Sequence, residues 1–270
     1  MSITTHSFVK TLASLALTSS VLLAATSTQA ETLISEGTLT VGMEIAYPPF
    51  ESYDGDKVVG FDPELATLLS EQMGVTPKFV DSKFTNLILG LSSDKFDTVI
   101  SGMYILPKRL ERTDAIAYAR TGAHIMTLKD SEQKPATEKE LCGLSVGLQQ
   151  GTSWVKDLEA LSTDYCLAND KAAITVRQYP TAPEVSQALL SRNIDAQVEI
   201  AGAAKMFSER SRGRIVISSL DLIYPQTLGI FVDKGNDALF NQLQSAMDAI
   251  KANGSYLALI EKYELTPVSE

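Results

Sequence analysis

The organisation of this chain follows from one stretch, which reads Asp97-Thr98-Val99-Ile100-Ser101-Gly102-Met103-Tyr104-Ile105-Leu106-Pro107-Lys108-Arg109. Its first part predicts a buried strand, its middle a turn of small residues, and its end a helical turn started by Pro107. The hydroxyl of Ser101 and free backbone N–H groups then lie at the strand's end, and Arg109 follows one turn later. Because a guanidinium offers a rigid fork of donors that matches a carboxylate, this order predicts a carboxylate-binding site.

Strands and helices alternate before this stretch. Apolar patterning and breakers predict the strand 38–42, the helix 63–73, the strand 78–80, the helix 84–91 and the strand 96–100. Asp62 is a good N-cap residue for the first helix, with Pro63 at its first position. A β-loop-α-β-α-β order is typical of a mostly parallel sheet with helices on both faces.

The alternation resumes after the polar segment 129–140. The pattern predicts the strands 144–148, 174–178, 194–200 and 215–218, a helix after Ser153 and another after Thr181, and the final helices 237–252 and 256–263. The β-rich run 116–128 and the strand 228–232 would cross between the halves. The sequence therefore predicts two α/β lobes, residues 31–126 plus 225–270 and residues 127–224, with a ligand cleft between them.

The N-terminus has the features of an export signal. Lys10 precedes an apolar run at 12–25, and Thr28-Gln29-Ala30 offers small residues at the positions that a signal peptidase reads, so residues 1–30 are predicted to be a signal peptide cleaved near Ala30. The whole chain has a net charge of −10, and residues 31–270 hold 22 basic and 33 acidic residues, a net charge of −11. We therefore expect a periplasmic protein that does not bind nucleic acid.

Two cysteines, Cys142 and Cys166, remain after the signal segment. In an oxidising compartment an even pair favours a disulfide, and the alternative is two buried thiols. Closing the loop between them would contribute roughly 3 kcal/mol in the loop-entropy model.

Enzyme and cofactor motifs are scarce in this sequence. It has no GxSxG, phosphate loop, GxGxxG or HExxH motif, and its one histidine outside the signal segment, His124, is expected to be structural. We therefore expect no cofactor, no metal site and no catalytic residue, and a binding protein rather than an enzyme.

Several polar and aromatic residues suit a binding cleft. Thr152 and Ser153 start a predicted helix, where they meet an anion or simply cap the helix, two roles that can also hold together. Tyr47 and Phe84 are either core aromatics or walls that flank a ligand. Glu44, at the exit of the first strand, is either a surface acid or a partner for a cationic group of the ligand.

A set of motifs follows in a fixed order along the chain: Tyr47-Pro48-Pro49-Phe50-Glu51, Gly60-Phe61-Asp62-Pro63-Glu64-Leu65, Phe96-Asp97, Ser101-Gly102-Met103 with Pro107 and Arg109, Val146-Gly147 with Gly151-Thr152, and Ile194-Asp195-Ala196. By these motifs the chain, from about Thr38 to Tyr263, resembles the family-3 solute-binding proteins of bacterial ABC transporters, the polar-amino-acid type. The resemblance implies a two-lobe, type II-like fold joined by a two-strand hinge. It also implies a monomer that closes on one small solute and delivers it to an inner-membrane ABC permease.

The resemblance also assigns roles to site residues. Arg109 and the backbone at Met103 and Tyr104 would hold the ligand's carboxylate from the first lobe. Thr152 and Ser153 would meet it from the second lobe. Tyr47 and Phe84 would flank the ligand's side chain, with Glu44 nearby.

Two positions depart from the family pattern. The residue after Gly-Met is Tyr104, which keeps a hydroxyl but adds a ring. The family's usual ammonium-binding Asp would fall at Ile200, and an apolar residue cannot balance an ammonium in a closed cleft. Three alternatives follow: Glu199 reaches in through a bulge, Glu44 serves instead, or the ligand is not an ordinary α-amino acid.

The function that the sequence favours is capture of a small carboxylate-bearing solute, with a polar amino acid as the leading candidate. One alternative is an enzyme similar to cyclohexadienyl dehydratases, with Glu199 or Glu44 as general acid. Another is a soluble receptor that hands its ligand to a sensor kinase.

Overall fold

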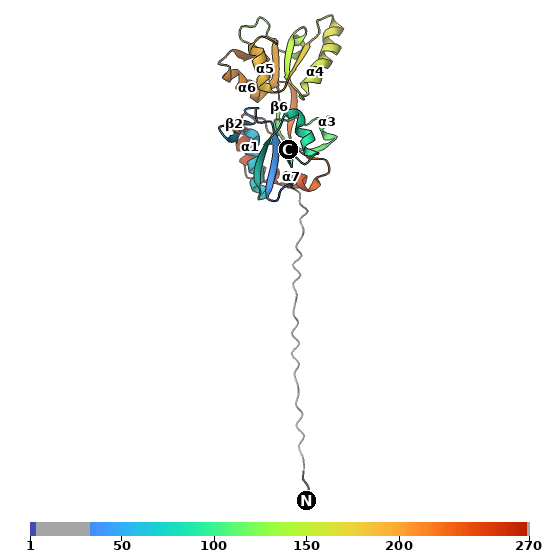
Figure 1. The fold of residues 1–270 in the computed structure, drawn as a ribbon, viewed down its shortest axis with the longest axis vertical. Coiled ribbons are helices and arrows are strands. Elements are labelled where there is room, and N and C mark those ends of the chain that lie inside the picture. Colours follow the sequence, from blue (N-terminus) through green and yellow to red (C-terminus); the bar gives the residue numbers. More distant parts are fainter. Residues whose placement is uncertain (4–32, 269–270) are drawn as a thin grey trace. The chain divides into compact units, whose positions relative to one another are not determined.

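The computed structural model describes residues 1–3 and 33–268 (Figure 1). The predicted signal segment and its cleavage near Ala30 fall largely outside this part of the chain. None of the helices in the described part has the length and apolar character needed to cross a membrane.

The first lobe is built on a parallel core of three strands. Strand β1, Thr38–Met43, lies between β4, Thr76–Asp81, and β5, Thr98–Val99. The remaining elements of this lobe are the hairpin β2 Ser52–Asp54 and β3 Lys57–Val59, and the helices α1 Phe61–Met73, α2 Leu87–Leu91, α3 Pro107–Leu110, α7 Asp237–Ala252 and α8 Ser255–Lys262.

The second lobe repeats the plan. Strand β7, Ser145–Gln149, pairs in parallel with β8, Thr175–Tyr179, and with β9, Ala196–Ile200. Its helices are α4 Trp154–Leu161, α5 Ala182–Leu190 and α6 Ala201–Arg210. The predicted disulfide is confirmed, because Cys142 and Cys166 are joined with their Cα atoms 5.5 Å apart.

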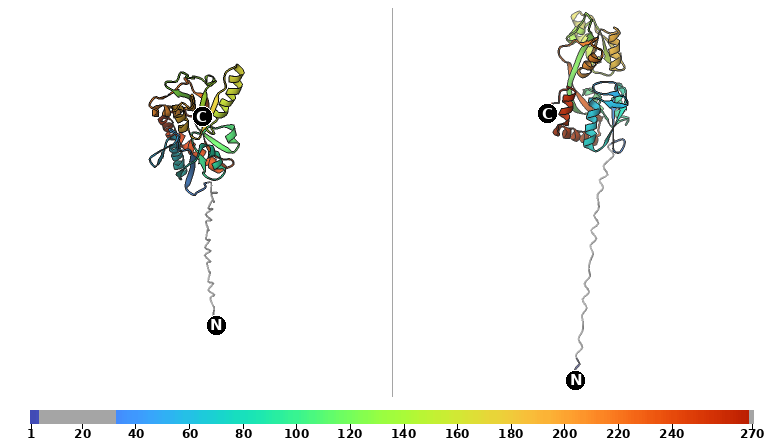
Figure 2. Two further views of the ribbon diagram at one scale, coloured as in Figure 1. Left: turned by 45° about the horizontal axis from the view of Figure 1, so that its top comes forward. Right: turned by 90° about the vertical axis from the view of Figure 1, so that its left-hand side faces the viewer.

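Two long antiparallel strands connect the lobes. They are β6, Thr113–Leu128, and β11, Ile223–Asp233, and Figure 2 shows them passing between the lobes in green and orange. They place all the major strands in one sheet of order β4-β1-β5-β11-β6-β9-β7-β8, with β10, Ile215–Ile217, beside β6. This topology confirms the predicted two-lobe α/β fold. The residues at which one lobe ends and the other begins stay a prediction, because β6 and β11 are continuous.

Three local predictions were wrong. Residues 84–91 form a 3₁₀ turn, Phe84–Asn86, followed by the short helix α2, and the strand predicted at 96–100 is only Thr98–Val99. Asp62 does not cap α1, which starts at Phe61 after Gly60. The Asp62 carboxylate instead accepts hydrogen bonds from the Gly102 N–H at 2.6 Å and the Tyr118 hydroxyl at 2.9 Å. These tertiary hydrogen bonds thus override the preference of Asp62 for an N-cap position.

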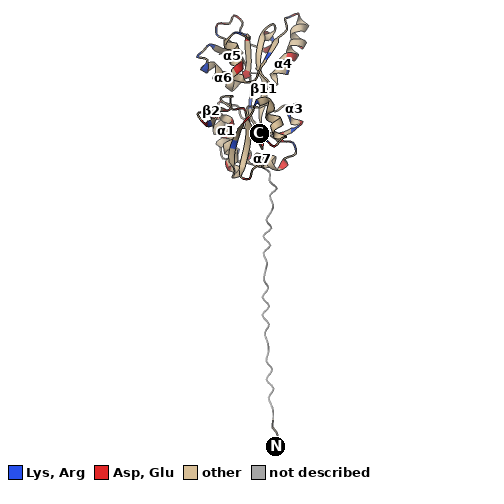
Figure 3. Ribbon diagram, viewed as in Figure 1, with Lys and Arg blue, Asp and Glu red and all other residues tan. Residues whose placement is uncertain are grey.

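Charged residues of both signs are interspersed over the helices and loops of both lobes (Figure 3). The ion pairs that join them are mostly solvent-exposed, as in Lys108–Glu111. Exposed pairs contribute little to stability, so we look for the functional chemistry among the buried polar groups instead.

Candidate functional site

Arg109 lies on the one-turn helix α3, directly after the turn that follows β5. Its guanidinium donates to the Tyr104 carbonyl at 2.6 Å and to the Gly151 carbonyl at 3.2 Å, and stacks over the Phe84 ring at 5.4 Å. Two of its five N–H groups are therefore used and three remain. Burial lowers the pKa of Arg109 to about 10, so it is still a cation at neutral pH.

Gly102 shapes the turn before Arg109. Its φ of +51° is in the left-handed region, and a Cβ there would approach the Tyr47 ring at 3.0 Å. Its N–H donates to Asp62, which fixes the turn from below. Only glycine adopts this left-handed φ and leaves room for the Tyr47 ring without strain.

The opposing surface is the end of β7 and the start of α4. The Thr152 hydroxyl donates to the Gln149 carbonyl at 2.9 Å, and the Ser153 hydroxyl has no hydrogen-bond partner among residues 1–3 and 33–268. The interpretation that one of these residues merely caps the helix is therefore wrong, since α4 has no side-chain cap. A Cβ on Gly151 would come within 3.1 Å of Thr85, so the lobes are in close contact here.

A small cavity of about 20 Å³ lies between these two surfaces, room for a single water molecule. Six of the ten predicted ligand-binding residues line it: Tyr47, Phe84, Tyr104, Arg109, Thr152 and Ser153. The lining also includes three residues that the sequence analysis did not single out as site residues, Gly102, Gln149 and Trp154. Both polar residues could have been predicted from the sequence, because Gln149 ends a strand and Trp154 is the only tryptophan in the sequence.

Three buried polar atoms in this cavity's lining have no hydrogen-bond partner within the described part of the chain. They are the Tyr104 hydroxyl, the Ser153 Oγ and the Trp154 Nε1. Buried polar groups in folded proteins are almost always paired, so each exception needs an explanation. Three exceptions in the lining of one cavity point to a bound molecule as the missing partner.

The two predicted acids lie just behind this lining. Glu44 accepts hydrogen bonds from the Phe84 N–H at 3.2 Å and from the Gln149 side chain. Glu199 accepts from the Tyr47 hydroxyl, from the Ile200 N–H at 2.9 Å and from Gln197 at 3.2 Å. Burial raises the pKa of Glu44, and that of Glu199 to about 7.

Glu199, rather than residue 200, faces the first lobe. Its carboxyl group reaches Tyr47 from a regular strand whose pairing with β6 shows no bulge. Ile200 is 1% exposed and belongs to the apolar core. A bulge is therefore not needed for an acid to reach the cleft.

Ser101 and Met103 lie beneath the cavity instead of lining it. The Ser101 hydroxyl donates to Glu51 at 2.6 Å and accepts from the Glu44 N–H at 3.0 Å, so protein groups already use it. Met103 packs in a small apolar cluster with Phe96. Both residues support the turn that carries Tyr104.

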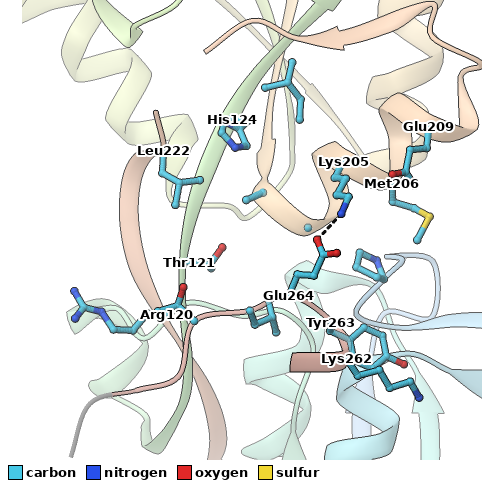
Figure 4. Close-up of a pocket in the computed structure, with 16 residues that line it drawn as sticks. Arg120, Thr121, His124, Lys205, Met206, Glu209, Leu222, Lys262, Tyr263 and Glu264 are labelled. Atoms are coloured by element: carbon cyan, nitrogen blue, oxygen red, sulfur yellow. Dashed lines mark hydrogen bonds and ion pairs between the residues drawn. The ribbon is translucent and has the colours of Figure 1, made fainter. Parts of the chain in front are cut away.

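A larger hollow of about 540 Å³ lies against the crossing strands (Figure 4). It is lined by Thr121 and His124 of β6, by α6 and by the C-terminal segment, and none of the predicted site residues belongs to it. Two of its charged groups, Lys205 and Glu264, form an ion pair with each other. Its size would favour this hollow as the functional site. The unpaired polar atoms lie instead in the lining of the small cavity, and we assign the functional site to that cavity. In the described ranges no three His, Cys, Asp or Glu residues are placed to hold a metal ion.

Two lobes joined by crossing strands, with unpaired donors gathered between them, define the class of closing-cleft binding proteins. The chain belongs to the bacterial extracellular solute-binding proteins, family 3, whose family model matches residues 39–266.

The three relatives described next share only 28% or 29% sequence identity with this chain. The L-cystine-binding protein TcyJ of Escherichia coli (strain K12) is 28% identical over 84% of this chain and 82% of its own length. The structure of an ancestral arginine-binding protein bound to arginine matches with a TM-score of 0.77 and 29% identity, over 84% of this chain and 98% of that one. The ancestral amino acid-binding protein AncCDT-1, a precursor of cyclohexadienyl dehydratase, matches with a TM-score of 0.74 and 28% identity, over 84% and 95% of the two chains.

Proposed function

We propose that this protein captures a polar amino acid by its carboxylate and delivers it to an ABC permease of the inner membrane. The observation that carries the proposal is the group of unpaired donors between the lobes: three N–H groups of Arg109, the Ser153 hydroxyl, the Tyr104 hydroxyl and the Trp154 N–H. Relatives named for binding cystine and arginine support the choice of an amino acid.

In this proposal Arg109, with the backbone at Met103 and Tyr104, holds the carboxylate from the first lobe. Ser153 and Thr152 meet it from the second lobe. Tyr47 and Phe84 flank the ligand, and their contacts with Glu199 and Glu44 bring those acids to the edge of the site. Glu199 then balances the ligand's ammonium group in place of the apolar Ile200.

Hinge closure is the proposed mechanism. Three hydrogen bonds join the lobes around the cavity: Arg109 to the Gly151 carbonyl, Gln149 to Glu44, and Tyr47 to Glu199. A ligand that bridges the same surfaces stabilises the closed form by its differential affinity for the two forms. The permease would then recognise the closed receptor.

The cellular setting belongs to the same proposal. After cleavage near Ala30 the receptor would work in the periplasm as a monomer, with lobes formed by residues 31–126 plus 225–270 and by residues 127–224. The extracellular character of its family supports this location.

A thermal-shift screen with the twenty amino acids and L-cystine tests the function. A ligand at 100 times its dissociation constant stabilises the folded state by about 2.7 kcal/mol, which raises the melting temperature measurably. Isothermal titration calorimetry on the hits then gives their affinities. If no amino acid raises the melting temperature or binds in calorimetry, the amino-acid proposal is wrong.

An enzyme on the same scaffold is the second candidate, and one observation favours it. Glu199 is a buried carboxyl group at the cleft with a pKa of about 7, which suits a general acid. The likeness to AncCDT-1 adds weight. Incubation with prephenate or arogenate tests it: we expect no aromatic product, and steady formation of one would make the dehydratase the better proposal.

A further inference from the structure

An aromatic contact crosses the cleft beside the cavity. Tyr104, on the turn after β5, meets Trp154, the first residue of α4, edge to face with ring centroids 5.7 Å apart and planes at 83°. Both residues are almost fully buried, at 5% and 2% exposure. The contact joins the two lobes at the site itself, so it forms only when the cleft is closed.

The polar tips of both rings are unpaired. The Tyr104 hydroxyl and the Trp154 Nε1 have no protein partner among the described residues. An indole N–H can only donate, and a hydroxyl can donate or accept. The indole N–H therefore needs an acceptor atom, and the hydroxyl a partner of either kind, that the described residues do not supply.

The ligand's carboxylate does not supply that acceptor in our scheme. A carboxylate accepts about four hydrogen bonds, and the three N–H groups left on Arg109, the Ser153 hydroxyl and the backbone N–H groups of Met103 and Tyr104 already offer it more donors than that. The Tyr104 hydroxyl and the Trp154 N–H are left over. They call for a second acceptor elsewhere on the ligand.

A cationic side chain, in contrast, supplies no acceptor of its own. It could still pair with the buried acids, since Glu44 accepts two hydrogen bonds and Glu199 three of the roughly four that a carboxylate can accept. A guanidinium or ammonium offers only donors, so it would leave the Trp154 N–H without an acceptor. The unpaired groups in the cavity thus complement an oxygen acceptor.

We propose that Tyr104 and Trp154 determine specificity, with the hydroxyl and the indole N–H donating to a side-chain oxygen of a compact amino acid. Carboxamide side chains, as in glutamine and asparagine, carry such an oxygen, and the side chains of arginine and lysine carry none. The contact between the two rings, which both line the cavity, closes the site on their side and so limits the length of the ligand. This inference rests on the proposed amino-acid function.

The test compares four probes: L-glutamine, L-asparagine, L-arginine and L-lysine. Trp154 is the only tryptophan in the chain, so its fluorescence reports binding directly, and calorimetry gives the dissociation constants. We expect glutamine or asparagine to bind at least about tenfold more tightly than arginine and lysine, as sites built to hydrogen-bond a substrate group discriminate strongly. Arginine or lysine binding as tightly as the carboxamides would overturn the inference.

Two variants remove single polar groups and keep the rings. Tyr104→Phe deletes the hydroxyl and Trp154→Phe deletes the N–H, and each is expected to weaken glutamine or asparagine binding about tenfold with little effect on arginine or lysine. Tyr53→Phe, on an exposed tyrosine, is the matched control and should change nothing. Melting temperatures check that each variant folds; if Trp154→Phe does not fold, Tyr104→Phe decides alone.

The outcomes separate the two proposals. Unchanged carboxamide affinity in the folded phenylalanine variants refutes the specificity role while leaving the amino-acid function intact. Absence of binding by every amino acid in the wild-type screen refutes the amino-acid function, and the specificity role with it.

Discussion

Arg109 is the residue on which we expect ligand affinity to depend most. In the proposed site, replacing it by alanine removes the main partner of the ligand's carboxylate and leaves that carboxylate desolvated and unpaired. Such a loss costs 2 kcal/mol or more at buried charged contacts, which is a loss of affinity of roughly thirtyfold. We expect Arg109→Ala to weaken the tightest amino acid of the screen by at least that factor in calorimetry. Arg112→Ala removes a nearby exposed arginine and should bind like the wild type. Wild-type affinity in Arg109→Ala would refute the carboxylate site.

Glu199 makes stability depend on pH. Its pKa rises from 4.5 to about 7 on folding because the carboxyl group is buried. Between these pH values the folded state binds more protons than the unfolded state, so the free energy of unfolding falls as pH rises from about 4.5 to about 7. The shift corresponds to about 3 kcal/mol. Asp62, Glu51 and Glu44 shift in the same direction and add to the trend.

Glu199→Gln removes this titration and keeps the size and polarity of the side chain. The difference in unfolding free energy between pH 5 and pH 8, measured by urea denaturation, should shrink by up to about 3 kcal/mol. Glu209→Gln, an exposed acid on α6, is the control and should leave the difference unchanged. An unchanged difference in Glu199→Gln would show that this acid ionises freely in the fold.

At the residue scale, the site residues that could be predicted from the sequence are the polar groups that follow strand ends. The residues that were missed belong to the site only through a contact with the other lobe. Arg109, Thr152 and Ser153 follow directly from the rule that binding residues gather where strands end. Trp154 becomes a site residue only because Tyr104 meets it from the other lobe. The error at Asp62 also comes from a distant partner, although here within one lobe, since Gly102 lies 40 residues away.

The turn at Gly102 is the element that orients the site. A substitution there shows whether glycine is required only for its left-handed backbone or also because the Tyr47 ring leaves no room for a Cβ. Gly102→Ala meets two penalties, a left-handed backbone worth about 1–2 kcal/mol and a Cβ placed 3.0 Å from the Tyr47 ring. Gly55→Ala meets only the first, because its φ is +60° and its surroundings are open. We expect Gly102→Ala to lower the free energy of unfolding by more than Gly55→Ala does. Equal losses would mean that Tyr47 moves freely and does not constrain the turn.

At the element scale, periodicity predicted the long strands and helices and failed at short ones. The α/β order of both lobes and the crossing strands were foreseen, because their apolar patterns are long. Thr98–Val99 is only two residues, and Phe84–Asn86 is a 3₁₀ turn, so neither is long enough to show a period. Their form is set by packing, which places Phe84 under the Arg109 guanidinium.

At the scale of the whole molecule, closure is held by buried hydrogen bonds rather than by surface charges. Gln149–Glu44 and Tyr47–Glu199 join the lobes inside the cleft, where water does not compete. Lys205–Glu264 also joins the lobes, at the hollow in Figure 4, but both side chains are more than half exposed. Exposed pairs are screened by salt and cost side-chain entropy.

The two kinds of contact make different predictions for ligand binding. Gln149→Ala removes a buried bond of the closed form, worth roughly 1 kcal/mol, and should weaken the tightest amino acid of the screen about fivefold, since fewer molecules are closed. Lys205→Gln should change that affinity less than twofold in physiological salt. Calorimetry gives both values, and small-angle scattering shows whether Gln149→Ala is more open before ligand is added. If Lys205→Gln weakens binding more than Gln149→Ala does, the hollow beside the crossing strands, and not the cleft, controls closure.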